Sequence, residues 1–289
     1  MRYLIVGGTG TLGHAVIAYL FKTDKNAEIH VFSREELKQK QLRKIHPEVT
    51  CHLGDVSNKG QVDTVFNFVS PDVVFHLAAL KHVDIAEENP EYCYAVNIMG
   101  TIHVAEAAVR CFADHVVFSS TDKAVLPINA YGAAKFAAEK YLYQMNNRGL
   151  KTKFSVFRWG NVLYSRGSVM HEFAETLLSE RKVYITDFKM TRFFIHIDDV
   201  ARFMCDNYKS APKDQPLVPQ MRAAKVVDLA DAVARYLEID DYQIVESGIR
   251  RGEKFHEVLW SEHDHCLRSD NCVQFSPDEL LALVKRALT

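Results

Sequence analysis

Residues 2–13 read RYLIVGGTGTLG, a short apolar run followed by a loop with four glycines. Three of these glycines have the spacing GxxGxxG. Glycines permit a tight turn and let a pyrophosphate approach backbone N–H groups at the start of a helix. The motif is weak alone but strong after the first strand of a βαβ unit, where it predicts dinucleotide binding; a purely structural turn is the alternative. The expected contacts in the loop are Gly7, Thr9, Gly10, Thr11, Leu12 and Gly13.

The rest of the first two-thirds alternates apolar runs with helical patterns. Such alternation predicts a parallel sheet covered by helices on both faces, with right-handed crossovers. We therefore expect an α/β fold, a Rossmann-type doubly wound parallel sheet. The expected strands are 2–6, 28–32, 49–53, 73–77, 115–119 and 153–158, and the expected helices are 12–22, 35–45, 58–69, 91–111 and 129–147.

After Trp159 the alternation loosens, which predicts a smaller C-terminal α/β lobe that holds the substrate. Helices are expected near 168–181, 198–210, 226–237 and from Pro277, with short strands near 183–185 and 242–245. The predicted domains are 1–165 together with about 195–212 for the sheet, and 166–194 with 213–289 for the lobe.

Composition narrows the class of protein. The 289 residues carry a net charge of only −2, which argues against a nucleic-acid or membrane-surface protein. The N-terminal apolar run is too short for a signal peptide, and no run reaches the roughly 20 residues of a membrane span. We expect a cytoplasmic protein with its six cysteines reduced. No metal is expected, because the spacing of His263, His265, Cys266 and Cys272 fits no familiar zinc site.

The end of the second strand indicates which cofactor binds. NAD-binding chains usually carry an acid here for the ribose hydroxyl, whereas this chain has Ser33, Arg34 and, one turn on, Lys38. A hydroxyl and two cations favour a 2′-phosphate, so the sequence predicts NADP. The following acids, Glu35 and Glu36, are expected at an exposed helix start, where acids are favourable. Asp55 and Val56 are expected to meet the adenine, although a helix cap is an alternative for this pair.

The densest reactive segment is SSTDKAVLPINAYGAAK, residues 119–135. Tyr131 and Lys135 stand one helical turn apart, so their side chains share a face. A lysine cation beside a tyrosine favours the phenolate and lowers the tyrosine pKa, which suits removal of a proton from a sugar hydroxyl. Thr121, Asp122 and Lys123 precede this pair; a helix or turn cap for Asp122 and a solvated loop position for Lys123 are the structural alternatives.

The glycine motif followed by YxxxK resembles the extended short-chain dehydrogenase/reductase superfamily. Within it, STDKA followed by PINAYGAAK is similar to the inverting UDP-N-acetylglucosamine 4,6-dehydratases of polysaccharide biosynthesis. The other similar stretches are SREELKQ (33–39), AALKHVDIAEENP (78–90), NIMGT (97–101), FRWGNVLYSRGSV (157–169), ITDFKMTRFF (185–194) and GIRRGEKFHE (248–257).

This resemblance implies a mechanism. Tyr131 and NADP+ oxidise carbon 4 of the sugar, with Thr121 bonded to its oxygen. Lys123, with a pKa lowered by burial or by cations such as Lys135, removes the acidified proton of carbon 5. Asp122, with a raised pKa, protonates the departing hydroxyl of carbon 6. Hydride then returns to carbon 6, and reprotonation of carbon 5 by Lys123 from the opposite face inverts that centre.

Two positions separate this chain from related dehydratases. Many carry glutamate where this chain has Lys123, and membrane-anchored retaining relatives commonly carry methionine at the position of Tyr131. The chain departs from its family at Arg251, where proline is common, and in the tail after residue 257.

The resemblance also implies further contacts. It places Ala78 and Ala79 at the cofactor. It assigns phosphate binding to Asn161, Arg192 and Arg250, the uridine ribose to Glu253 and a substrate contact to Lys81; for the cations, an ordinary surface position is the alternative. A homo-oligomer paired through the helices at 91–111 and 129–147 is expected. The rival hypotheses are another nucleotide-sugar epimerase, dehydratase or reductase, and a non-catalytic NADP-binding sensor.

Overall fold

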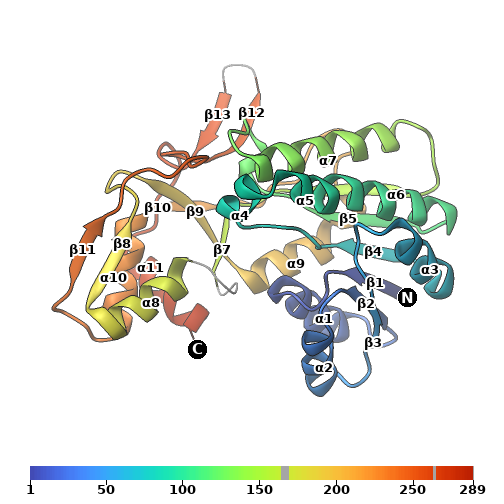
Figure 1. Ribbon diagram of the computed structural model, residues 1–289, viewed down its shortest axis with the longest axis horizontal. Helices are drawn as coiled ribbons and strands as arrows, with labels where there is room; N and C mark the ends of the chain where they lie inside the picture. Colours follow the sequence, from blue (N-terminus) through green and yellow to red (C-terminus); the bar gives the residue numbers. More distant parts are fainter. Residues whose placement is uncertain (164–168, 263–264, 289) are drawn as a thin grey trace.

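The central element of the fold is a six-stranded parallel sheet of order β3-β2-β1-β4-β5-β6 (Figure 1). The computed structural model describes residues 1–163, 169–262 and 265–288. This order confirms the predicted doubly wound fold, in which ligands bind where the strand order reverses, beside β1 and β4. The strands are β1 (Arg2–Val6), β2 (Glu28–Ser33), β3 (Thr50–Leu53), β4 (Val73–His76), β5 (His115–Ser119) and β6 (Lys153–Phe157).

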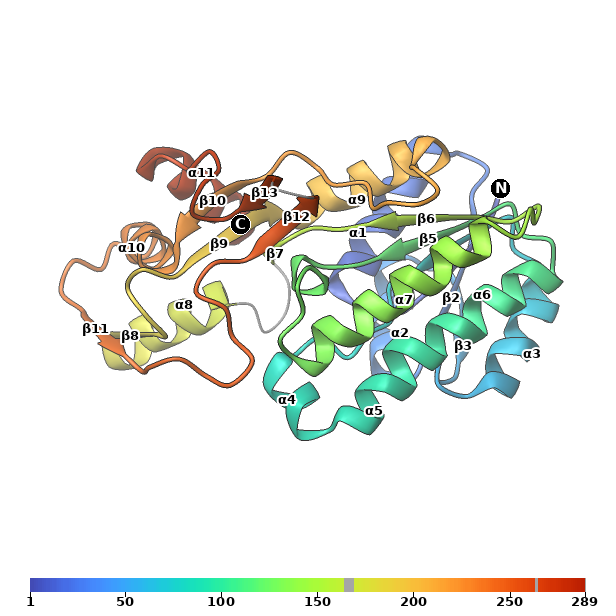
Figure 2. The same ribbon diagram turned by 90° about the horizontal axis from the view of Figure 1, so that it is seen from above.

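Helices cover both faces of this sheet (Figure 2). One apolar core joins the sheet to α3 (Lys59–Val69), α6 (Gly100–Arg110) and α7 (Ala130–Asn146). The other joins it to α1 (Thr11–Thr23), α2 (Glu36–Ile45) and α9 (Ile197–Asn207). The strands are buried on both sides, which is why they read as continuous apolar runs in the sequence.

The predicted helix at 91–111 is interrupted. It consists of α5 (Pro90–Tyr94), a π-helical turn η1 (Ala95–Met99) and α6. Inside the π turn, the buried Asn97 side chain accepts a hydrogen bond from Leu80 N at 2.8 Å and donates one to Leu80 O at 3.0 Å. The wider turn thus ties the helix to the loop after β4. The short helix α4 (Val83–Glu88) was not predicted from the sequence.

The C-terminal third adds a smaller α/β lobe, seen beyond the carboxyl ends of the large sheet in Figure 1. It contains the helices α8 (Val169–Glu180), α10 (Val226–Tyr236) and α11 (Pro277–Leu288), around a third core. The predicted cap of α11 is confirmed, because Ser276 and Glu279 exchange backbone-to-side-chain bonds of 2.9 and 3.3 Å. The predicted strands correspond to β8 (Lys182–Ile185) and β11 (Gln243–Glu246), which pair in parallel.

Five short strands in this part of the chain were missed. A three-stranded sheet joins β7, β9 and β10, and a hairpin joins β12 and β13. Their residues lack a clear alternation, and partners such as β7 and β9 are far apart in the sequence. The strands are β7 (Asn161–Leu163), β9 (Thr191–His196), β10 (Arg222–Lys225), β12 (Val258–Glu262) and β13 (His265–Arg268).

The predicted domain division stays a prediction, and its first boundary at residue 165 lies outside the described residues. Helix α9 contributes Val200 and Met204 to a core of the large sheet. None of the helices in the described ranges has the length and apolar character that a membrane span requires.

Candidate active site

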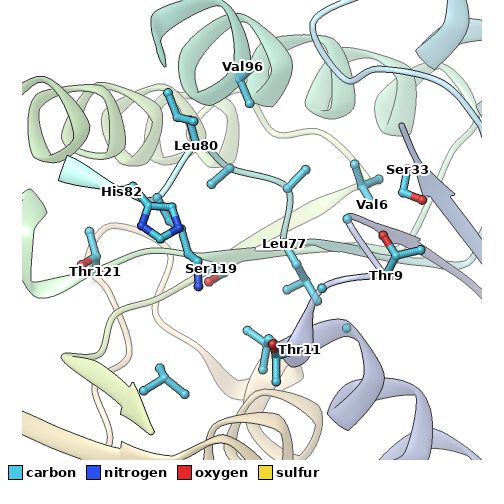
Figure 3. Close-up of a pocket in the computed structure, with 18 of the residues that line it drawn as sticks. Val6, Thr9, Thr11, Ser33, Leu77, Leu80, His82, Val96, Ser119 and Thr121 are labelled. Carbon is cyan, nitrogen blue, oxygen red and sulfur yellow. The ribbon is translucent and has the colours of Figure 1, made fainter. Parts of the chain in front are cut away.

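A cavity of about 740 Å³ opens at the carboxyl ends of β1, β4 and β5. It runs from the glycine loop at Thr9 and Thr11 to Thr121 and His82 at the other end (Figure 3). Most of the predicted site residues line it: Gly7, Thr9, Gly10, Thr11, Leu12, Gly13, Ser33, Arg34, Lys38, Asp55, Val56, Ala78, Ala79, Lys81, Thr121, Lys123, Tyr131, Lys135 and Asn161. Asp122, Arg192, Arg250 and Glu253 are not part of its wall.

The glycine loop has the geometry of a dinucleotide cradle. Gly7 has φ +85°, and a Cβ there would lie 2.6 Å from Ala78 N. A Cβ on Gly13 would lie 2.3 Å from Gly8 O, so helix α1 packs closely against the loop. Gly10 is the N-cap of α1 and brings no side chain to its first N–H groups. The loop therefore fits a bound pyrophosphate.

The cations at the end of β2 have partners within the protein. Arg34 hydrogen-bonds the Tyr92 hydroxyl, and its Nη1 lies 3.8 Å from Asp55 Oδ2. Lys38 Nζ is 2.6 Å from Glu35 Oε1, and Glu35 is the exposed N-cap of α2, as expected. Both cations stay about one-third to one-half exposed, at 48% and 35%, and line the cavity.

Asp55 does not cap the helix that follows it. The N-cap of α3 is Asn58, which accepts from Gln61 N at 3.1 Å. Asp55 instead accepts from Ser57 N at 2.9 Å and Ser57 Oγ at 2.7 Å. The helix-cap alternative is therefore wrong for Asp55, which combines a local turn with a place on the cavity wall.

Tyr131 and Lys135 lie four residues apart on the first two turns of α7. Asn129 caps this helix by accepting from Gly132 N at 2.7 Å. Lys135 Nζ donates to Ser119 O at 2.8 Å and lies 4.4 Å from the Phe118 ring centroid. Burial lowers the pKa of Lys135 to about 8.

The expected lowering of the Tyr131 pKa by Lys135 is wrong in this structure. Burial raises the pKa of Tyr131 to about 12, and it outweighs the opposing effects of Lys123 and of a hydrogen bond with Thr121. Tyr131 is 8% exposed, so water does little to stabilise a phenolate.

A second cluster surrounds Lys123, in the 3-10 turn η2 (Asp122–Ala124). Its Nζ lies 3.0 Å from Asp122 Oδ1, 3.3 Å from Asn161 Oδ1 and 3.3 Å from Glu257 Oε1. Thr121 Oγ1 also donates to Asp122 Oδ1, at 3.0 Å. Lys123 is thus no solvated loop lysine, since its side chain is only 19% exposed.

The charges of this cluster follow from burial and proximity. Asp122 is fully buried, and burial raises its pKa even against the pull of Lys123, as expected for an acid that gives up a proton. The expected lowering of the Lys123 pKa is wrong. Burial alone would lower this pKa, but the carboxyl groups of Asp122 and Glu257 outweigh burial and raise it. Lys123 is therefore held as an ammonium.

The predicted substrate residues divide into those that line the cavity and those that do not. Burial lowers the pKa of Lys81, which lines the cavity together with Asn161. Arg192 is buried and donates to Thr191 O at 2.8 Å and Phe255 O at 3.1 Å. Arg250 and Glu253 lie in the loop between β11 and β12, where Glu253 Oε2 accepts from Thr186 Oγ1 at 3.2 Å.

Sequence reasoning missed several residues of the site, among them Tyr92 and Glu257. Tyr92 contacts Arg34, with the guanidinium carbon 5.7 Å from the ring centroid. Glu257 contacts Lys123 from the segment directly before β12. The only signal for Glu257 was its place at the end of the stretch GIRRGEKFHE.

Residues 3–275 match the model of a family described as polysaccharide biosynthesis protein. The chain belongs to this family. It is 38% identical to a UDP-N-acetylglucosamine 4,6-dehydratase (inverting) of Campylobacter jejuni, over 90% of this chain and 78% of that protein. It is 34% identical to a UDP-glucose 4-epimerase of Rickettsia massiliae, over 92% of this chain and 80% of that protein.

Among solved structures, the fold is similar to that of Pen from Bacillus thuringiensis. The TM-score is 0.91 at 28% identity, with 99% of this chain and 97% of that chain covered. The family resemblance drawn from the motifs is therefore confirmed, and the dehydratase prediction agrees with the named relatives.

Proposed function

We propose that the protein is an NADP-dependent inverting 4,6-dehydratase of UDP-N-acetylglucosamine. The observation that carries the proposal is the pairing of Asp122 with Lys123, 3.0 Å apart, beside the cavity that Tyr131 and Lys135 also line. The named dehydratase relatives support the same activity.

The glycine loop, Ser33, Arg34 and Lys38 would hold the cofactor. When bound, a nicotinamide supplies reversible two-electron oxidation at carbon 4 of the sugar. The preference for NADP rests on the two cations at the end of β2, whose partial exposure leaves them able to meet a 2′-phosphate.

The side chains of the chain would handle the protons. Tyr131, once its phenol has lost a proton, would take the proton of the hydroxyl on carbon 4, and Thr121 would hydrogen-bond that oxygen. Lys123, once its ammonium has given up a proton, takes the proton on carbon 5. Asp122, whose neutral form burial favours, protonates the departing hydroxyl of carbon 6.

Asn161, Lys81, Arg192, Arg250 and Glu253 remain the proposed substrate contacts. The cytoplasmic location and the homo-oligomer also stay predictions. Met99 and Phe136, 45% and 40% exposed, belong to the helical segments expected to pair.

The test is incubation of the protein and NADP with UDP-N-acetylglucosamine in deuterated water. The expected product is a UDP-4-keto-6-deoxy-hexosamine with deuterium at carbon 5 and inverted configuration there, read by NMR. A sugar epimerised only at carbon 4 would instead favour the activity named for the Rickettsia relative. Absence of turnover on a panel of UDP- and dTDP-sugars, with tight NADP binding, would favour the sensor.

A further inference from the structure

Glu257 is a buried carboxylate that the mechanism above does not use. It is 2% exposed and directly precedes β12. Its backbone N donates to Ser269 Oγ at 3.0 Å, and Ser269 N donates to Glu257 O at 2.9 Å. Ser269 Oγ is itself held by Thr191 on β9, 2.6 Å from its hydroxyl. These bonds fix the backbone from which the carboxylate extends.

Cations surround this carboxylate. Its Oε1 lies 3.3 Å from Lys123 Nζ, and its Oε2 lies 3.8 Å from Lys254 Nζ. Oε2 is buried and has no hydrogen-bond partner in the described part of the chain. Burial would raise the pKa of Glu257, but Lys123, Arg192 and Lys254 lower it overall, so the side chain stays charged.

We propose that Glu257 is a positioning residue for Lys123 in the reaction proposed above. Its carboxylate fixes the amine against Asp122 and Asn161 and, together with Asp122, keeps the amine protonated in the free enzyme. The lobe that carries the substrate contacts thereby also sets the charge state of the group that acts on carbon 5.

The direction in which the pKa of Lys123 changes when the Glu257 charge is removed follows from the charged and titratable groups that face Lys123. These include Asp122 on η2, Glu257 before β12, Arg192 on β9, Tyr131 on α7 and Lys254, three residues before Glu257. Removal of the Glu257 charge leaves Asp122 as the remaining carboxyl group of this set beside Lys123, while burial and the Arg192 cation still favour the neutral amine. The pKa of Lys123 should then fall.

Competitive acetylation measures this pKa without any substrate. The full-length protein is treated with limiting acetic anhydride across a pH series, and modification of Lys123 is read by mass spectrometry. In Glu257→Gln, the midpoint for Lys123 should move down by at least about one pH unit, which raises the neutral fraction about tenfold at lower pH. Glu246→Gln, the same change at an exposed position on β11, should leave the midpoint unchanged.

Turnover provides a second readout. Only a neutral Lys123 can take the proton of carbon 5, so turnover should rise as the pH rises through the pKa of Lys123. In Glu257→Gln, this rising limb of the pH–activity curve should move to lower pH. The kcat should fall while KM for the UDP-sugar stays within twofold, because the amine is no longer held in place. A structural defect would lower kcat equally at every pH and would leave the limb where it is.

Glu257→Asp keeps the charge but draws it back by one methylene. It should lower the acetylation midpoint less than Glu257→Gln and restore part of kcat. If Glu257→Gln does not fold by circular dichroism, this variant decides the question. An unchanged Lys123 midpoint in a folded variant overturns the inference.

The two proposals fail in different ways. If the wild-type protein forms no keto sugar from UDP-N-acetylglucosamine, the proposed function fails, and acetylation still measures the link between Glu257 and Lys123. If the product forms but the midpoint does not move, only the role of Glu257 fails.

Discussion

The two lysines of the cavity occupy opposite electrostatic environments. Lys135 contacts the Ser119 carbonyl and the Phe118 ring, and burial lowers its pKa to about 8. Lys123 has carboxylate oxygens at 3.0 and 3.3 Å, which raise its pKa against burial. Both are buried amines beside one cavity, but Lys123 directly contacts two carboxyl groups that outweigh burial, whereas the effect of Glu139 on Lys135 does not.

The two lysines belong to two regions of the active site, the Tyr131 and Lys135 pair and the Lys123 cluster, which are built differently. The Tyr131 and Lys135 pair comes from one helix, α7, although its cap residue Asn129 also donates to Gly252 O at 2.8 Å. The Lys123 cluster joins η2 to Asn161 on β7 and to Glu257 before β12. A change at Glu257 should therefore affect dehydration more than the redox step.

The largest effect is expected from Lys123→Ala. Turnover should fall about 10³-fold, within the range of general acid–base groups, because no amine remains to take the carbon 5 proton. Oxidation at carbon 4 should persist, so reduced nicotinamide should accumulate, as followed by its absorbance. Lys225→Ala, at an exposed position, is the control. Near-normal turnover in Lys123→Ala would remove this lysine from the mechanism.

Tyr131→Phe should lower turnover about 10²-fold, because the hydroxyl on carbon 4 loses its proton acceptor. In contrast to Lys123→Ala, it should leave no reduced nicotinamide in a single turnover. Tyr143→Phe makes the same change on the same helix, at a buried hydroxyl that has no hydrogen-bond partner among the described residues, and should behave as wild type. Reduced nicotinamide in Tyr131→Phe would contradict the separation of the two regions.

Arg34→Ser tests cofactor binding at the end of the cavity that lies beside β2. Loss of a charge-assisted contact of about 2 kcal/mol should weaken NADP binding about 30-fold and change NAD binding less than twofold. Isothermal titration calorimetry with both nucleotides measures the ratio. If the binding of NADP and of NAD is weakened equally, Arg34 does not contact a 2′-phosphate.

Ser269→Ala should have the smallest effect. It removes the hydroxyl that bonds Glu257 N, which is worth about 1 kcal/mol, so turnover should fall about fivefold with carbon 4 oxidation unchanged. Ser261→Ala, at an exposed position on β12, is the control. A defect in the redox step of Ser269→Ala would break the distinction between the regions.

Local spacing made much of the protein predictable. The glycine loop, the six strands of the large sheet and the capping pair Ser276 and Glu279 were read correctly, because each depends on neighbours within a few residues. The π turn at Asn97 was not, because the loop at Leu80 that it bonds lies far away in the sequence.

The sequence by itself determined the doubly wound fold, the family and the presence of Tyr131, Lys135, Asp122 and Lys123 in one short segment. Only the tertiary structure decided the charges of these groups, and it reversed the expected pKa shifts of Tyr131 and Lys123. The physical reason is that a pKa depends on burial and on charges a few ångströms away. For Lys123, one of those charges belongs to Glu257, which lies more than 100 residues further along the chain.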